Sequence, residues 1–76
     1  MKGDILTWAR LKADKWEELR ADAREATASG RDIEAAECYR MADVIRADLG
    51  KEGFSVKQRY GQIILKDPAG VVRMHG

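Results

Sequence analysis

The feature that most restricts the fold of this chain is a change in apolar spacing at Gly50-Lys51-Glu52-Gly53. Before this segment, apolar residues recur every three or four positions, which is typical of helices. After it, β-branched and aromatic residues in short runs, separated by turn-forming residues, favour strands. A chain of 76 residues holds one small core, so both parts must share it. The sequence therefore predicts a single α+β domain spanning residues 1–76.

Two helices are predicted before this change, at about residues 4–29 and 32–50. Asp4 and Asp32 are the expected N-caps, and Gly30 can adopt the left-handed conformation of a C-cap. Because the connection is so short, the helices should lie antiparallel. The first has an apolar stripe of Ile5, Ala9, Trp16, Leu19, Ala23 and Ala26. The stripe of the second is Ala35, Cys38, Ala42, Ile45 and Leu49, with Tyr39 expected at its edge as a core residue.

Three strands are predicted after the change, at about residues 54–59, 62–67 and 71–75. Tyr60-Gly61 suits a two-residue hairpin turn, and Asp67-Pro68-Ala69-Gly70 suits a type I turn. The expected architecture is an antiparallel helical hairpin packed on a three-stranded antiparallel sheet, in the order ααβββ. In this register Arg59 opposes Gln62 and Asp67 opposes Gly70.

This register divides the strand residues between two faces. The face expected to cover the helices carries Phe54, Val56, Gln58, Ile63, Leu65, Val72 and Met74. The other face carries four basic residues around Ile64 and Val71, namely Lys57, Arg59, Lys66 and Arg73. The basic residues are also concentrated near the C-terminal end. Residues 1–50 have nine basic and eleven acidic side chains, whereas residues 51–76 have five basic and two acidic ones. The basic face is therefore the first candidate site, for phosphates of a nucleic acid or for an acidic partner.

The helix before the glycine stop also shows a family-like pattern. Tyr39, Ala42-Asp43, Ile45-Arg46, Leu49 and Gly53 are spaced as in the C-terminal end of cysteinyl-tRNA synthetase, and residues 63–70 resemble the hairpin that follows there. The resemblance covers about half of the chain. It departs where residues 54–62 are inserted, where the family's tryptophan after the last glycine is missing, and where the catalytic domain is absent. It implies a helix-plus-hairpin module that belongs to the tRNA-binding end in that family.

Two functions remain open at this point. One is a non-catalytic module that binds RNA, and tRNA in particular, through the basic sheet face. RNA-binding sheets usually expose aromatic side chains for base stacking, and none is predicted on this face. The alternative is a protein-interaction module, such as a phage-encoded accessory or inhibitor protein, acting alone or as a homodimer. Its candidate surface is Trp8, Leu11, Ile33 and Val44.

Several classes of function are not expected. His75 and Cys38 are the only histidine and cysteine, so neither a metal site nor a disulfide is predicted, and no cofactor motif is recognised. No catalytic constellation is evident, so we do not expect an enzyme. The lone cysteine suits a reducing cytoplasm. No apolar run is long enough for a signal peptide or a membrane span, so no membrane association is expected.

Overall fold

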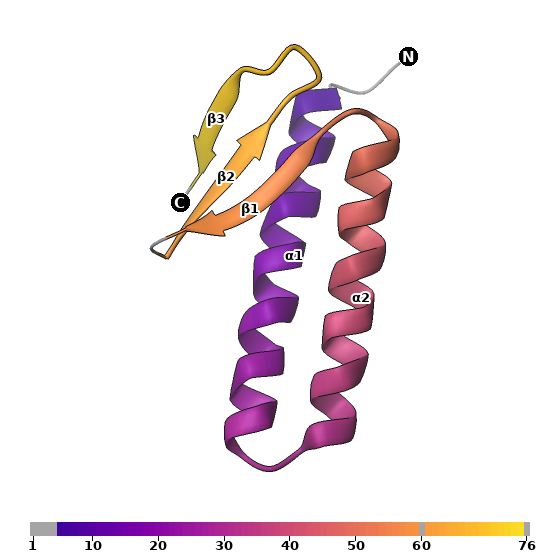
Figure 1. The fold of residues 1–76 in the computed structure, drawn as a ribbon, viewed down its shortest axis with the longest axis vertical. Coiled ribbons are helices and arrows are strands. Elements are labelled where there is room, and N and C mark those ends of the chain that lie inside the picture. Colours follow the sequence, from indigo (N-terminus) through magenta and orange to yellow (C-terminus); the bar gives the residue numbers. More distant parts are fainter. Residues whose placement is uncertain (1–4, 60, 76) are drawn as a thin grey trace.

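The computed structural model describes the backbone of residues 5–59 and 61–75, with side chains up to residue 72. Two helices, α1 (Ile5–Ala28) and α2 (Asp32–Lys51), form an antiparallel hairpin. Three strands follow, β1 (Ser55–Arg59), β2 (Gln62–Lys66) and β3 (Val72–His75). Every bound lies within one residue of the range expected from the sequence, and the α+β class is as predicted (Figure 1).

Both helices end in the same glycine-dependent geometry. After α1, Arg31 N–H donates to Ala26 O at 2.8 Å, and Gly30, with φ of 77°, donates to Thr27 O. This is a Schellman motif, in which a left-handed residue lets the chain satisfy the last helical carbonyls. The sequence predicted this use of Gly30. The predicted N-cap at Asp32 is wrong, because Arg31 is the N-cap residue and it makes no side-chain capping bond. Asp4 lies outside the described residues.

The same motif at the end of α2 connects the helices to the sheet. Phe54 N–H donates to Leu49 O at 2.9 Å, and Gly53 has φ of 84°. Leu49 and Phe54 are both buried, which is the apolar contact that usually accompanies a Schellman motif. A Cβ atom at Gly53 would lie 2.9 Å from Pro68 Cγ. The end of α2 is therefore packed directly against the β2–β3 turn.

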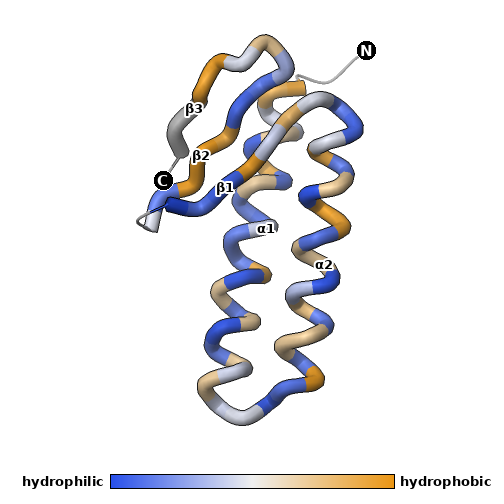
Figure 2. The backbone as a smooth tube through the Cα atoms, viewed as in Figure 1, coloured by the Kyte–Doolittle hydropathy of each residue, from blue (hydrophilic) through white to orange (hydrophobic). Residues whose placement is uncertain are grey.

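The core lies between the helices and the first two strands. Small residues let the helices approach closely, since Ala9, Ala13 and Ala23 are fully buried. The strands supply the larger apolar residues, with Val56, Ile63 and Leu65 at 1% exposure or less. Along β1 and β2 these buried positions alternate with more exposed ones, although the middle of β2 is a continuous hydrophobic run (Figure 2). The alternation follows from the two-residue period of a strand, which buries one face and exposes the other.

The predicted packing of the helices on a three-stranded sheet needs correction. The strands hydrogen-bond in the order β1-β2-β3, but the layer that covers the helices is a two-stranded antiparallel sheet. The principal contacts between the layers join β1 to α2 and β2 to α1. β3 pairs with β2 on the side away from the helices (Figure 1), and none of the principal contacts between the layers involves it. β3 is therefore an edge strand, and the packing of the sheet on the helices comes mainly from β1 and β2.

The register of the second hairpin also differs from the prediction. The first hairpin pairs Arg59 with Gln62, as expected, although Tyr60 lies outside the described residues. In the second, Lys66 pairs with Val72 and Leu65 with Arg73, one residue away from the expected pairing. A one-residue shift moves every position of the strand to the other face. Positions 72 and 74 therefore lie on the outer face, where the sequence had placed 71 and 73.

The geometry of the turn explains this shift. Gly70 N–H donates to Asp67 O at 2.9 Å, which closes the predicted type I turn, but Gly70 itself is left-handed with φ of 85°. Asp67 N–H then donates to Val71 O at 3.1 Å. A type I turn followed by a left-handed glycine is a three-residue hairpin loop, which is one residue longer than the loop expected.

Candidate nucleic-acid interface

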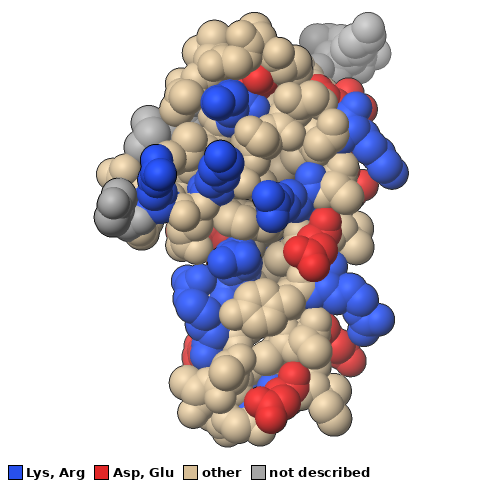
Figure 3. Space-filling view, viewed as in Figure 1, with Lys and Arg blue, Asp and Glu red and all other residues tan. Residues whose placement is uncertain are grey.

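Three of the four predicted basic residues share the outer face of the sheet. Lys57, Arg59 and Lys66 are exposed, whereas their neighbours Val56 and Leu65 are buried on the helix side. Lys57 pairs with Ile64, so Lys66 is its diagonal neighbour, and such positions lie about 7 Å apart. Figure 3 shows Lys and Arg side chains gathered over the strands and the adjoining part of the helices.

The fourth predicted residue does not belong with these three. Arg73 pairs with Leu65, and directly opposed residues of an antiparallel pair share a face. Position 73 therefore lies on the helix-facing side of the sheet. The side chain of Arg73 lies outside the described residues. The prediction of a four-residue basic face is wrong at this position, because the loop before β3 is one residue longer than expected.

The structure adds arginines from both helices to the basic face. A shallow cavity of about 250 Å³ lies beside β1 and is lined by Trp16, Arg20, Arg46, Val56, Lys57 and Gln58. We call it the arginine cavity. Its charged lining residues come from three elements, with Arg20 on α1, Arg46 on α2 and Lys57 on β1, and all three are cationic. Such a concave cationic site is suited to an anion such as a phosphate.

Arg20 is held in place by two aromatic rings. Its guanidinium carbon lies 5.0 Å from the centroid of Trp16 and 6.0 Å from that of Tyr39. Both distances are within the range of cation–π attraction. The Nε atom of Arg20 is buried and has no hydrogen-bond partner among the described residues. Trp16 is buried, whereas Tyr39 is 38% exposed, so the prediction of Tyr39 as a core residue is wrong.

Arg24 extends the same surface by one turn of α1. It is exposed, and its Nη1 atom donates to Gln58 Oε1 at 3.4 Å. This bond joins α1 to β1 across a sequence separation of 34 residues. Together we call Arg20, Arg24, Arg46, Lys57, Arg59 and Lys66 the basic surface.

The acidic residues of the described chain do not neutralise this surface through ion pairs. The ion pairs between described residues are Lys15–Glu18, Arg31–Glu34 and Lys51–Asp48, each three residues apart on or beside one helix. None of the six cations of the basic surface takes part in them. Within the described residues, these six side chains therefore keep their charge available for an external anion.

The predicted apolar surface is only partly formed. Trp8 is not a surface residue of this kind, because it packs on the core with its ring edge toward Phe54, 6.5 Å between centroids. Leu11, Ile33 and Val44 are exposed at 65%, 79% and 56%. Leu11 is on α1, whereas Ile33 and Val44 are on α2, about 16 Å apart along its axis. Met41, three positions before Val44, is also exposed at 53% and was not anticipated.

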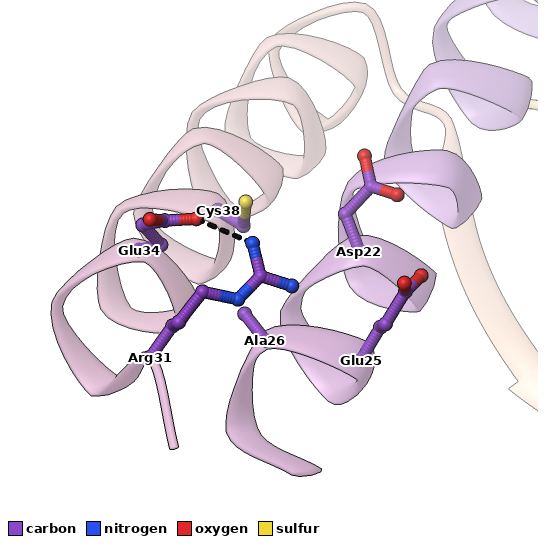
Figure 4. Close-up of a pocket in the computed structure, with 6 residues that line it drawn as sticks. All are labelled: Asp22, Glu25, Ala26, Arg31, Glu34 and Cys38. Carbon is purple, nitrogen blue, oxygen red and sulfur yellow. Dashed lines mark hydrogen bonds and ion pairs between the residues drawn. The ribbon is translucent and has the colours of Figure 1, made fainter. Parts of the chain in front are cut away.

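A second cavity, of about 290 Å³, lies at the turn between the helices (Figure 4). Half of its six lining residues are acidic, and Asp22 and Glu25 from α1 face Glu34 and Cys38 from α2. Arg31 lies between the two helices and binds Glu34 at 2.8 Å. The described residues contain no group of three or more histidine, cysteine or acidic side chains arranged to hold a metal ion.

Sequence reasoning missed Arg20, Arg24, Arg46 and Tyr39 as members of one surface. Their spacing carries a usable signal, since Arg20 and Arg24 are four apart on α1, and Tyr39 and Arg46 are seven apart on α2. Each pair therefore shares a helix face. What the spacing could not show is that both faces border β1, because that depends on how the sheet is placed on the hairpin.

Comparisons with known proteins do not identify the chain. No protein-family model, curated protein or solved structure matches it. The resemblance to cysteinyl-tRNA synthetase therefore stays a prediction. In the part of the chain that the structure describes, no helix is long and apolar enough to cross a membrane.

Proposed function

We propose that this chain is a non-catalytic RNA-binding module that uses the basic surface. The observation that carries the proposal is the arginine cavity, where cations from α1, α2 and β1 converge and no acidic residue lines the wall. The net charge is only +1, so binding would depend on this local concentration of charge rather than on the charge of the whole chain. The synthetase-like helix and hairpin make tRNA the first RNA to test.

Salt dependence provides the test of this proposal. Labelled tRNA is titrated with the protein at 50 mM and 200 mM salt, and the logarithm of the binding constant is compared with that of the salt concentration. Replacing Lys57, Arg59 and Lys66 with glutamine should reduce the magnitude of the slope by roughly 2 to 3, since each phosphate contact contributes about 0.7 to 0.9. The matched control is Lys15→Gln, which also removes a charge but lies about 140° around α1 from Arg20.

Two outcomes would contradict the proposal. One is the absence of binding at 50 mM salt. The other is an unchanged slope in the triple variant while the variant keeps its helical circular dichroism. Either result would show that the basic surface does not bind RNA phosphates.

A protein-interaction function is the second candidate, and a different surface supports it. Ile33, Met41 and Val44 are exposed on α2, whereas its buried stripe of Ala35, Ala42, Ile45 and Leu49 faces the core. In this reading the chain is an accessory or inhibitor protein, or a homodimer. Light scattering measures the homodimer directly. If light scattering gives the molar mass of a monomer at 100 μM, and replacing Ile33 and Val44 by serine leaves that mass unchanged, the result would count against a homodimer.

A further inference from the structure

The surroundings of Arg20 leave the edge of its guanidinium suited to binding a phosphate. Trp16 and Tyr39 occupy positions against its guanidinium at 5.0 and 6.0 Å, while no hydrogen bond or ion pair engages the group within the described residues. A planar guanidinium binds phosphate through the N–H groups at its edge. Because the two rings already restrict the side chain, little further rotamer freedom is lost when a phosphate binds.

Arg46 and Lys57 are placed to complete the site. Both line the arginine cavity with Arg20, and both are exposed. The neutral wall is made of Trp16, Val56 and Gln58. Three cations around one concave site offer several N–H donors to the two non-bridging oxygens of a backbone phosphodiester, and they attract it more strongly than an isolated surface lysine does.

Tyr39 supplies the exposed aromatic ring that is not predicted on the outer face of the sheet. It is exposed at 38% and lies next to Arg20, so a flat aromatic side chain borders the cationic cavity. Single-stranded nucleic acids bind by combining a cationic groove with aromatic rings on which bases stack. Bases in a duplex are already stacked and paired, so they cannot reach such a ring.

We infer that the arginine cavity binds a backbone phosphate of single-stranded RNA through Arg20, Arg46 and Lys57, while an adjacent base stacks on Tyr39. The inference rests on the proposed RNA binding and narrows it to unpaired nucleotides. Lys57 belongs to both the cavity and the sheet face, so a strand leaving the cavity would continue toward Arg59 and Lys66.

The test compares unpaired with paired RNA. Fluorescence anisotropy at 50 mM salt measures binding of a labelled 12-nucleotide oligouridylate and of a 12-base-pair RNA duplex. The single strand should bind at least tenfold more tightly. Tyr39→Leu, which keeps apolar bulk but removes the ring, should weaken single-strand binding about tenfold and leave duplex binding unchanged. Tyr39→Phe should retain the wild-type affinity.

A variant of Arg20 separates the effect of its positive charge from the effect of the shape of its guanidinium group. Arg20→Lys keeps the positive charge but loses the planar fork of N–H donors, so it should weaken single-strand binding about fivefold with little change in salt slope. Lys15→Gln is again the control, and circular dichroism confirms that each variant is folded.

The outcomes distinguish this inference from the function on which it rests. Equal affinity for single strand and duplex, with Tyr39→Leu and Tyr39→Phe both indistinguishable from wild type, would overturn the inference and leave RNA binding by the basic surface intact. The absence of binding to tRNA, oligouridylate and duplex alike would overturn both.

Discussion

Replacing Gly53 with alanine tests the contact that joins the helices to the sheet. Gly53 has φ of 84°, and an added Cβ would lie 2.9 Å from Pro68 Cγ and 3.0 Å from Pro68 Cβ. Left-handed backbone costs a non-glycine residue about 1–2 kcal/mol. Carbon atoms prefer to be about 3.5–4.0 Å apart, and relieving such crowding costs about 1–3 kcal/mol more. We expect Gly53→Ala to reduce the free energy of unfolding by the sum of these two terms, about 2–5 kcal/mol.

Gly30 provides a matched control for this substitution. Its φ is 77°, and an added Cβ would meet no atom within 4 Å. Gly30→Ala should therefore cost only the backbone penalty of about 1–2 kcal/mol. Urea unfolding followed by circular dichroism measures both variants, and the difference between them isolates the contact with Pro68.

A double-mutant cycle completes the test. Pro68→Gly removes both atoms that crowd Gly53, so the cost of Gly53→Ala on that background should fall to the cost of Gly30→Ala. Equal destabilisation by Gly53→Ala and Gly30→Ala in the otherwise unchanged protein would refute the close packing of the β2–β3 turn on the end of α2. This packing bears on function, because it fixes the sheet over the helix end and so helps to place Lys57 beside Arg46.

Two further predictions follow from the turn and from the basic surface. Asp67 Oδ1 accepts hydrogen bonds from the backbone N–H groups of Ala69 and Val71 at 3.0 and 2.9 Å, so Asp67→Ala should cost about 1–2 kcal/mol in urea unfolding; a loss below 0.3 kcal/mol would contradict this. Asp43 is exposed on α2 between Tyr39 and Arg46 in the sequence, so Asp43→Asn should raise RNA affinity a few-fold at 50 mM salt and have little effect at 300 mM, where charges are screened. Unchanged or weaker binding at low salt would show that Asp43 does not lie near the bound phosphates.

The local features of this fold could be read from the sequence because each depends on neighbouring residues. Gly30 ends α1 as predicted, since a left-handed C-cap needs only a glycine after an amphipathic stripe. The pairing of Arg59 with Gln62 was also predicted correctly, because a two-residue loop leaves a single register. These features depend on backbone sterics and on the period of the apolar residues.

The second hairpin shows where local reasoning fails. The Asp67-Pro68-Ala69-Gly70 turn was recognised, but the left-handed conformation of Gly70 adds one residue to the loop. That single residue reverses the face of position 73 and removes Arg73 from the predicted site. A turn motif in the sequence gives the type of turn more reliably than the length of the loop.

The sequence by itself determined two antiparallel amphipathic helices, a following set of short strands and an excess of basic residues near the C-terminal end. Only the tertiary structure decided that two strands, and not three, cover the helices, and that their placement brings Arg20 and Arg46 beside Lys57. The physical reason is that helices and turns are specified by local sterics and periodicity. The position of the sheet depends instead on long-range packing of Phe54, Val56 and Leu65 against alanine-rich helices, which also decides which charges share a surface.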